Sequence, residues 1–294
     1  MAERRVLVRR AVAADRARIL EISGKIWNGD DYVPETLDAW LTDAGGELVV
    51  ATLAERVISF AHRSWLCPGI AWFEGIRTDP EFQGYGAGRA ITEYLIGSAR
   101  GDGAARIGLS TYIDNEASIH IIEAYGFRRV ATYCYLERAA QVPSNIPSQG
   151  GTVRPLSEAE TVAFVADSEF LSLAARRFPR GWRFFPFDHD PREATARLAY
   201  RTGVEENGTL AAVLCARQGP KHEGAITVNF LDGTPDGMHT LLHHALTWYR
   251  GRPMECMLPV SQTQRAAAYA PLIDAGFTPW NDFAPDVFLY ELWL

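Results

Sequence analysis

The chain has few of the features that mark a special class of protein. Cysteine is scarce, with four residues far apart in 294 (Cys67, Cys134, Cys215 and Cys256), which excludes the paired spacing of a zinc site or a redox dithiol. No apolar run reaches the length that spans a membrane, and no hydrophobic leader precedes the first strand-like segment. We therefore expect reduced structural thiols, no metal site, no membrane partner and a cytoplasmic protein.

Positive charge is also in short supply. The formal net charge is −7, and lysine occurs only twice, so arginine provides nearly all of the basic side chains. A chain without a broad basic face cannot neutralise a nucleic-acid backbone, which excludes nucleic acid as the expected partner. Hydrophobic residues make up 47% and charged residues 22%, as in ordinary globular proteins, so one large domain or two smaller ones can form.

One stretch organises the chain. An apolar segment of strand length over residues 70–78 leads through Pro80 into a loop with three glycines, and a helical pattern begins at Gly88. Glycines let the backbone approach a ligand closely, and the amide groups at a helix start favour anions. The pattern predicts a main-chain site for a phosphate or pyrophosphate. An ordinary strand-to-helix turn is the alternative interpretation.

The loop does not fit the common nucleotide motifs. No Gly-Lys-Ser/Thr follows the glycines, and the spacing is wrong for a dinucleotide fingerprint. The run from Gln83 to Gly88 resembles the GNAT N-acetyltransferase signature Gln/Arg-x-x-Gly-x-Gly/Ala, with Pro80 three residues before Gln83. The segment 115–127, from an Asn to a Gly-Phe pair, resembles the later helix of the same family. Two motifs in order identify a GNAT-like chain by resemblance.

The resemblance implies acetyl-CoA as co-substrate and an amine as acceptor, joined directly in a ternary complex. It implies a mixed, mostly antiparallel central sheet flanked by helices. It also implies that the loop holds the pyrophosphate and that the preceding strand and the later helix contact the pantetheine arm. The cofactor-binding residues expected on this basis are Ile76, Arg77, Thr78, Gln83, Gly84, Tyr85, Gly86, Ala87, Gly88, Arg89, Asn115 and Ser118. For Asn115, helix capping is an equally weighted alternative.

The second half of the chain repeats the order of the first in weaker form. Residues 152–156 and the following helical stretch resemble the start of the chain, and Asp274 to Phe277 resembles the earlier segment before Phe127. The phosphate loop is missing there, and Asp232 and Asp236 occupy its place. We predict a catalytic GNAT domain over residues 1–140, a linker over 141–151 and a degenerate GNAT-like domain over 152–294. The aromatic segment 178–187 would line an acceptor cleft or form a packing plug.

Glu74 is the expected general base. Aminolysis of a thioester needs a neutral amine, and some members of the family that this chain resembles carry their base on this strand. Strand alternation places Glu74 on the face of Trp72 and Thr78. A strand carboxylate paired to Arg63 or Arg77 is the alternative.

The general acid is where the chain departs from the family pattern. The tyrosine expected seven residues after Asn115 is Ile122. Tyr125, one helical turn on, is the named candidate, with core packing as its alternative. Tyr112, Ser118 and His120 are weaker substitutes, and water is another. His239 and His243 share a helix face, but no third metal ligand accompanies them, so we expect packed or solvated histidines.

The favoured function is acetyl-CoA-dependent N-acetylation of a small primary amine by a monomer or homodimer. Acetylation of a protein or peptide is the second interpretation. A non-catalytic acyl-CoA sensor is the third, because the expected acid is missing and the second half has no loop. Turnover with an amine panel separates the enzymes from the sensor.

Overall fold

The computed structural model describes residues 5–140, 150–196, 198–218, 224–261, 263–281 and 285–294. It divides into two compact units, the first formed by Met1–Arg128 with Tyr290–Leu294 and the second by Arg129–Leu289. Residues 141–149, most of the expected linker, lie outside the described part. The observed division comes after Arg128, before the expected linker, and the last five residues return to the first unit.

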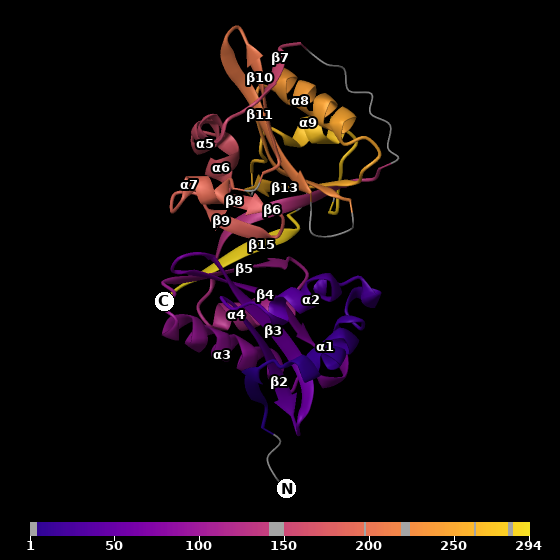
Figure 1. Ribbon diagram of the computed structural model, residues 1–294, viewed down its shortest axis with the longest axis vertical. Coiled ribbons are helices and arrows are strands. Elements are labelled where there is room, and N and C mark those ends of the chain that lie inside the picture. The colour runs from indigo at the N-terminus through magenta and orange to yellow at the C-terminus, as the bar shows by residue number, and fades with distance from the viewer. Residues whose placement is uncertain (1–4, 141–149, 197, 219–223, 262, 282–284) are drawn as a thin grey trace. The chain divides into compact units, whose positions relative to one another are not determined.

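The first unit is a sheet with helices on both faces, and its strands run in the order β1-β2-β3-β4-β5-β15. Figure 1 shows α1 and α2 on one face and α3 and α4 on the other. Neighbours from β1 to β4 are antiparallel, whereas β4 and β5 are parallel. The elements are β1 (Leu7–Arg10), η1 (Ala13–Asp15), α1 (Arg16–Ser23), η2 (Trp27–Gly29), α2 (Val33–Leu41), β2 (Glu47–Leu53), β3 (Arg56–Cys67), β4 (Ile70–Thr78), η3 (Pro80–Phe82), α3 (Ala87–Gly101), β5 (Arg106–Tyr112), α4 (Glu116–Ala124) and the end of β15 (Val287–Trp293).

Apolar spacing explains how these elements pack. Ile19 and Ile22 on α1 and Leu37 on α2 meet Val50 and Phe60 of the sheet in one buried cluster. On α3, the apolar residues recur every three to four positions, as the pattern in the sequence predicts, and they are buried. Fully burying a side chain of this kind contributes about 1.5–3 kcal/mol. The two helical layers therefore hold β3 and β4 between them.

The second unit is also a sheet with helices, in the strand order β6-β13-β12-β11-β10-β7, with β14 beside β6 and a separate β8–β9 hairpin. Only β12 and β13 form a parallel pair among its described strands. Its elements are β6 (Arg128–Arg138), β7 (Thr152–Pro155), α5 (Glu158–Ala166), α6 (Glu169–Leu173), β8 (Arg177–Arg180), β9 (Arg183–Pro186), α7 (Pro191–Ala194), β10 (Tyr200–Glu206), β11 (Thr209–Gln218), β12 (Ile226–Gly233), α8 (Pro235–Trp248), β13 (Met254–Val260), α9 (Tyr269–Asp274), β14 (Thr278–Pro279) and the start of β15.

The predicted fold class, a mixed and mostly antiparallel sheet flanked by helices, is confirmed. Five strands were not expected, namely β8, β9, β10, β14 and β15. In the first unit, β15 is held by the Tyr290 hydroxyl, which donates to Glu123 Oε1 at 2.8 Å, and by the Leu294 amide, which donates to the Ala105 carbonyl at 3.0 Å. These contacts join residues far apart in sequence, so no local pattern could predict them.

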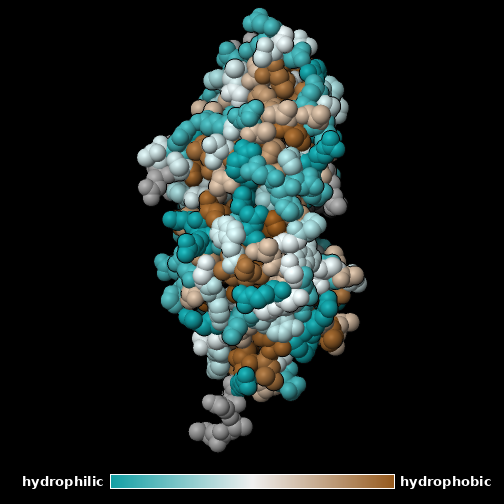
Figure 2. Space-filling model, turned by 90° about the vertical axis from the view of Figure 1, so that its left-hand side faces the viewer, coloured by the Kyte–Doolittle hydropathy of each residue, from teal (hydrophilic) through white to brown (hydrophobic). Residues whose placement is uncertain are grey.

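The visible surface is mixed in character. Figure 2 shows small groups of hydrophobic side chains set among hydrophilic ones on the face in view. Among the described residues, no helix has the length and apolar character needed to cross a membrane.

Candidate functional site

The parallel strands β4 and β5 stay paired for three residues only. Their register runs from Ile70 opposite Arg106 to Trp72 opposite Gly108, and the pairing stops there although both strands continue. At the last paired position, the Trp72 ring lies directly against the backbone of Gly108, because a Cβ there would lie only 2.9 Å from the ring. Beyond Trp72, the edge of β4 that faces β5 is unpaired and can form main-chain hydrogen bonds to a ligand. We call this unpaired edge the strand opening.

The glycine loop follows the open part of β4. Gly84 and Gly86 have φ values of +84° and +82°, which favour glycine, and an added Cβ at either position would meet no described atom within 4 Å. Gly86 is the N-cap of α3, and no described side chain caps it. The first amide groups of this 15-residue helix therefore face an exposed, open loop, and such amides bind anions. The residues present fit a pyrophosphate group.

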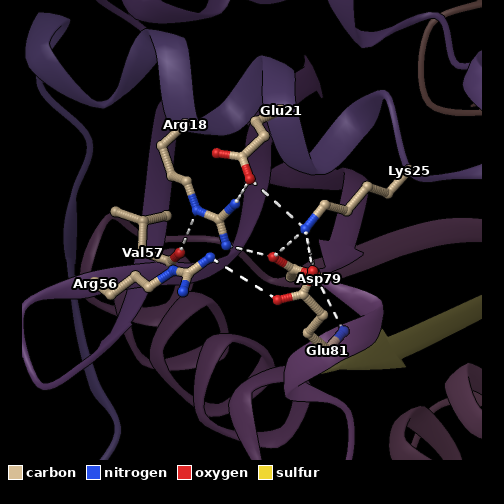
Figure 3. Close-up of polar contacts among 7 residues, drawn as sticks. All are labelled: Arg18, Glu21, Lys25, Arg56, Val57, Asp79 and Glu81. Atoms are coloured by element: carbon tan, nitrogen blue, oxygen red, sulfur yellow. Dashed lines mark hydrogen bonds and ion pairs between the residues drawn. The ribbon is translucent and has the colours of Figure 1, made fainter.

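A buried carboxylate anchors the start of this loop, as Figure 3 shows. Asp79 is fully buried and forms ion pairs with Arg18 and with Lys25, the latter at 3.2 Å. Its side chain also accepts a hydrogen bond from the Glu81 amide at 3.1 Å, while Arg18 Nε donates to the Val57 carbonyl at 3.0 Å. Burial opposes the charge of Asp79, but the Glu81 amide, Arg18 and Lys25 together lower its pKa. The loop is thus fixed to α1 and to the start of β3.

Glu74 lies on β4 just past the last paired residue, and its partners come from β3. Its Oε1 atom is 3.0 Å from His62 Nδ1 and accepts a hydrogen bond from Ser64 Oγ at 3.1 Å. The two arginines considered as partners bind other carboxylates, since Arg63 pairs with Asp102 and Arg77 with Asp31. Glu74 is half-buried, which suits a carboxylate that exchanges protons with a bound substrate.

The expectation that Glu74 and Thr78 share a face is wrong. Between Glu74 and Arg77, β4 advances three residues while β3 advances two, from His62 to Phe60. The extra residue is accommodated at Gly75, whose φ is +64°. Residues directly opposite each other share a face, so Glu74 and Arg77 lie on the α1/α2 face.

Thr78 lies on the other face. It is opposite Ser59 in the register, and its Oγ1 atom is 3.0 Å from Ser59 Oγ. Of the three strand residues expected at the pantetheine arm, Arg77 thus turns its side chain toward α1 and α2, and Ile76 is half-buried beside it.

The α1–α2 connection places aromatic and charged groups beside Glu74 that the sequence did not single out. The Arg77 guanidinium lies 4.4 Å from the centre of the Trp27 ring and is held by buried Asp31. Trp27 also meets Tyr112, with ring centres 5.8 Å apart. Burial raises the pKa of Tyr32 far above its ordinary value, so its hydroxyl is protonated at neutral pH. A set of aromatic rings beside one ion pair can receive an amine substrate.

The later helix gives a mixed outcome for its predicted residues. Asn115 caps α4 through its side chain, which accepts from the Ser118 amide at 3.3 Å, while its Nδ2 donates to Thr111 Oγ1. The capping alternative is therefore observed. Ser118 is half-buried in the first turn of the helix, and Ile122 is buried.

Tyr125 contacts α3. Its hydroxyl donates to the Arg89 carbonyl at 3.3 Å and lies 3.4 Å from Glu93 Oε2. Partial burial and the Glu93 charge raise its pKa. Tyr125 is half-buried at the contact between the end of α4 and α3.

The cysteine thiols are free, and three of them are buried. Burial raises the pKa of Cys134 to about 11 and that of Cys215 to about 12, and it raises that of Cys256 further. Such thiols are protonated at neutral pH and are poor nucleophiles. Among the described residues, no group of three or more His, Cys, Asp or Glu side chains is arranged to hold a metal ion.

Comparison with known proteins decides the class. Residues 16–127 match the model of the acetyltransferase (GNAT) family. The matched range lies within the first unit. The matched range holds the strand opening, the glycine loop and Glu74. The chain is an acyltransferase.

One relative of known sequence and two solved structures are similar to the chain. The chain is 29% identical over 121 residues to the N-alpha-acetyltransferase RimI of Mycobacterium tuberculosis, covering 40% of this chain and 75% of that protein. The fold is similar to a GCN5-related N-acetyltransferase from Sphaerobacter thermophilus, with 16% identity, TM-score 0.65 and coverage of 100% and 97%. A putative acetyltransferase from Thermoplasma acidophilum is also 16% identical, with TM-score 0.57 and coverage of 98% and 100%.

Proposed function

We propose that this protein transfers the acetyl group of acetyl-CoA to a primary amine in a ternary complex, using the GNAT domain of the first unit. The observation that carries the proposal is the strand opening after Trp72 together with the uncapped, exposed glycine loop before α3. Acetyl-CoA supplies the acetyl group as a thioester. The main chain from Gln83 to Arg89 would hold its pyrophosphate, and the open edge of β4 from Ile76 to Thr78 would hold its pantetheine arm.

Glu74 is the proposed general base. An alkylammonium group has a pKa of about 10.4, so the amine must lose a proton before it can attack. The Glu74 carboxylate, held by His62 and Ser64, accepts that proton directly or through one water. No covalent enzyme intermediate is needed, in agreement with the protonated state of the buried cysteines.

The acceptor is proposed to be a small primary amine seated against Trp27, Tyr32 and Tyr112. A protein or peptide amino terminus is the second candidate, and the similarity to RimI, named as an N-alpha-acetyltransferase, favours it. The second unit is proposed to be a degenerate GNAT-like domain without cofactor. A cytoplasmic location is part of the same proposal.

The test is release of free thiol from acetyl-CoA with two matched sets of acceptors, small amines and short peptides with free amino termini. Calorimetric titration should find one acetyl-CoA site per chain, and it should disappear when the glycine loop is altered. Turnover faster with one acceptor set assigns the substrate class. Thiol release that no amine stimulates would contradict the proposal.

Tyr125 keeps a proposed role as the acid that protonates the leaving thiolate. Tyr125→Phe removes the hydroxyl and should lower kcat while leaving acetyl-CoA affinity unchanged. A variant that matches the wild type would assign Tyr125 to the α3–α4 contact alone.

A further inference from the structure

His62 lies buried on β3 between two carboxylates. Its Nδ1 atom is 3.0 Å from Glu74 Oε1, and its Nε2 atom is 3.3 Å from Asp43 Oδ2. The His62 side chain is 2% exposed, whereas that of Asp43 is 34% exposed. Nε2 is buried and has no hydrogen bond of good geometry to any described residue, so Asp43 is the group that faces it. A buried polar atom in this position costs free energy unless it is used.

Packing fixes the orientation of the ring. His62 stacks on Trp40 of α2, with ring centres 4.8 Å apart and planes 12° apart. Trp40 in turn fills the space beside Gly75, where a Cβ would lie 2.5 Å from Trp40 Cη2. The glycine that creates the β4 bulge therefore also admits the tryptophan that holds His62 against Glu74.

Other polar and charged groups surround this pair. Ser64 Oγ donates to the same Glu74 oxygen, at 3.1 Å. Tyr32 is close enough for Glu74, Arg77 and Asp31 to influence its pKa, which burial raises. On the opposite side of the ring, Asp43 Oδ1 accepts the Gly45 amide at 2.9 Å, which orients the carboxylate that faces Nε2.

We propose that His62 is the positioning residue of the catalytic base: through Nδ1 it holds the carboxylate of Glu74 in place on the α1/α2 face, and through Nε2 it connects the base to Asp43 near the surface. The proposal rests on the proposed role of Glu74. A carboxylate held from one side by an imidazole and a hydroxyl presents a defined lone pair to its substrate, and a small displacement of such a group has a large kinetic effect. His62 itself does not contact the reacting atoms.

Two substitutions separate the two ends of the ring. In His62→Asn, the side-chain amide can take the place of Nδ1, so the hydrogen bond to Glu74 is kept and the Asp43 end is lost. In His62→Gln, the amide reaches toward the Nε2 position, so the Asp43 end is kept and the bond to Glu74 is lost. Both variants remove the stack on Trp40, so a purely structural role would affect them alike.

The experiment measures kcat, KM for each substrate and the pH profile of kcat/KM in both variants, with thermal unfolding to confirm folding. We expect His62→Gln to lower kcat about tenfold and to move the acid limb of the profile, with KM for acetyl-CoA unchanged. His62→Asn should stay within about threefold of the wild type. In a Glu74→Gln background, His62→Gln should cause no further loss, because the base it positions is gone. Equal losses in the two His62 variants, or additive losses in the double variant, would overturn the proposal.

A readout that does not depend on turnover separates this proposal from the proposed function. The ¹⁵N resonances of the His62 ring should respond at Nδ1 to Glu74→Gln and at Nε2 to Asp43→Asn, even if no acceptor is found. Wild-type chain that shows these responses but never transfers acetyl groups contradicts the function and leaves the contact standing. Active wild type whose His62 resonances ignore both substitutions contradicts the positioning role alone.

Discussion

Each of the two units contains one short pair of parallel strands, but the residues that follow the pair differ. In each unit, one parallel pair extends over three residues, Ile70–Trp72 with Arg106–Gly108 in the first and Ile226–Val228 with Met254–Cys256 in the second. In each, the first strand of the pair then leads to a long helix, α3 or α8. The repeated geometry supports the proposed tandem origin of the chain.

The residues beyond the parallel pair differ between the units. The first unit has Glu74 four residues after Ile70, the first paired residue, and the second unit has Phe230 four residues after Ile226. The Phe230 ring packs with the rings of Phe164, Phe170 and Phe178. The second unit therefore fills with apolar rings the place that the first unit gives to a carboxylate.

The helix starts differ in the same sense. Helix α3 begins at uncapped, exposed Gly86, whereas α8 begins at Thr234, whose own side chain accepts the Gly237 amide at 3.2 Å. A Cβ at Gly237 would lie 2.8 Å from Ala212 and from Thr234, so this start is closed by the chain's own atoms. The Asp232 carboxylate accepts the Phe170 and Gly233 amides, and burial raises its pKa. Helix starts bind a ligand only where the protein leaves them unsatisfied.

The largest expected effect comes from removing the carboxylate of Glu74, which the second unit lacks at the corresponding position. Glu74→Gln should lower kcat/KM at neutral pH at least a hundredfold, the usual scale for loss of a general base, and should leave acetyl-CoA affinity unchanged. Steady-state kinetics over a pH range measure it. The control is Glu47→Gln, which alters a buried carboxylate bonded to Ser98 and Tyr94 outside the opening. An unchanged pH profile in Glu74→Gln would remove Glu74 from the mechanism.

The anchor of the loop should give the next largest effect. Asp79→Asn removes the buried carboxylate that Arg18 and Lys25 share, and leaves these cations only the exposed carboxylates of Glu21 and Glu81. The substitution should lower the free energy of unfolding by about 2 kcal/mol at pH 7. Because the folded pKa of Asp79 is lowered, its contribution is present above the unfolded value of 3.8 and is lost as the pH falls through the folded value. Urea unfolding at pH 7 and pH 3 should therefore show the difference shrinking in acid.

The control for that experiment is Asp38→Asn, which breaks an exposed pair with Arg16 and should change stability little. If both variants were equally stable at every pH, the buried network would not be what holds the loop to α1.

The sequence was informative where structure depends on near neighbours. The bounds of β4 agree with the segment 70–78 predicted from the sequence, and the glycine loop lies where the helix pattern placed it. It was uninformative where partners lie far apart in the chain. The bulge at Gly75 changed the face of Thr78, and nothing near Glu74 in sequence indicated that His62, twelve residues earlier, would contact it.

Closing the open helix start should give a smaller effect than removing the base. Gly86→Val places a β-branched residue at a φ of +82° and should weaken acetyl-CoA binding about tenfold, measured by calorimetry. Gly103→Val is the matched control, because its φ is +86° and its surroundings are equally open. Both should lose about 1–2 kcal/mol of stability from backbone strain, but only the first should lose affinity. Equal affinity in the two variants would place the pyrophosphate elsewhere.

The smallest effect is expected from opening the closed helix start of the second unit. Thr234→Ala removes the side-chain acceptor of the Gly237 amide and should lower the free energy of unfolding by about 1 kcal/mol, as loss of an N-cap does. It should leave kcat/KM and the single acetyl-CoA site unchanged, because Phe230 and the rings packed around it still occupy the position that corresponds to Glu74. Calorimetry that found a second acetyl-CoA site in Thr234→Ala would show that one capping side chain, and not the rings around Phe230, keeps the second unit free of acetyl-CoA.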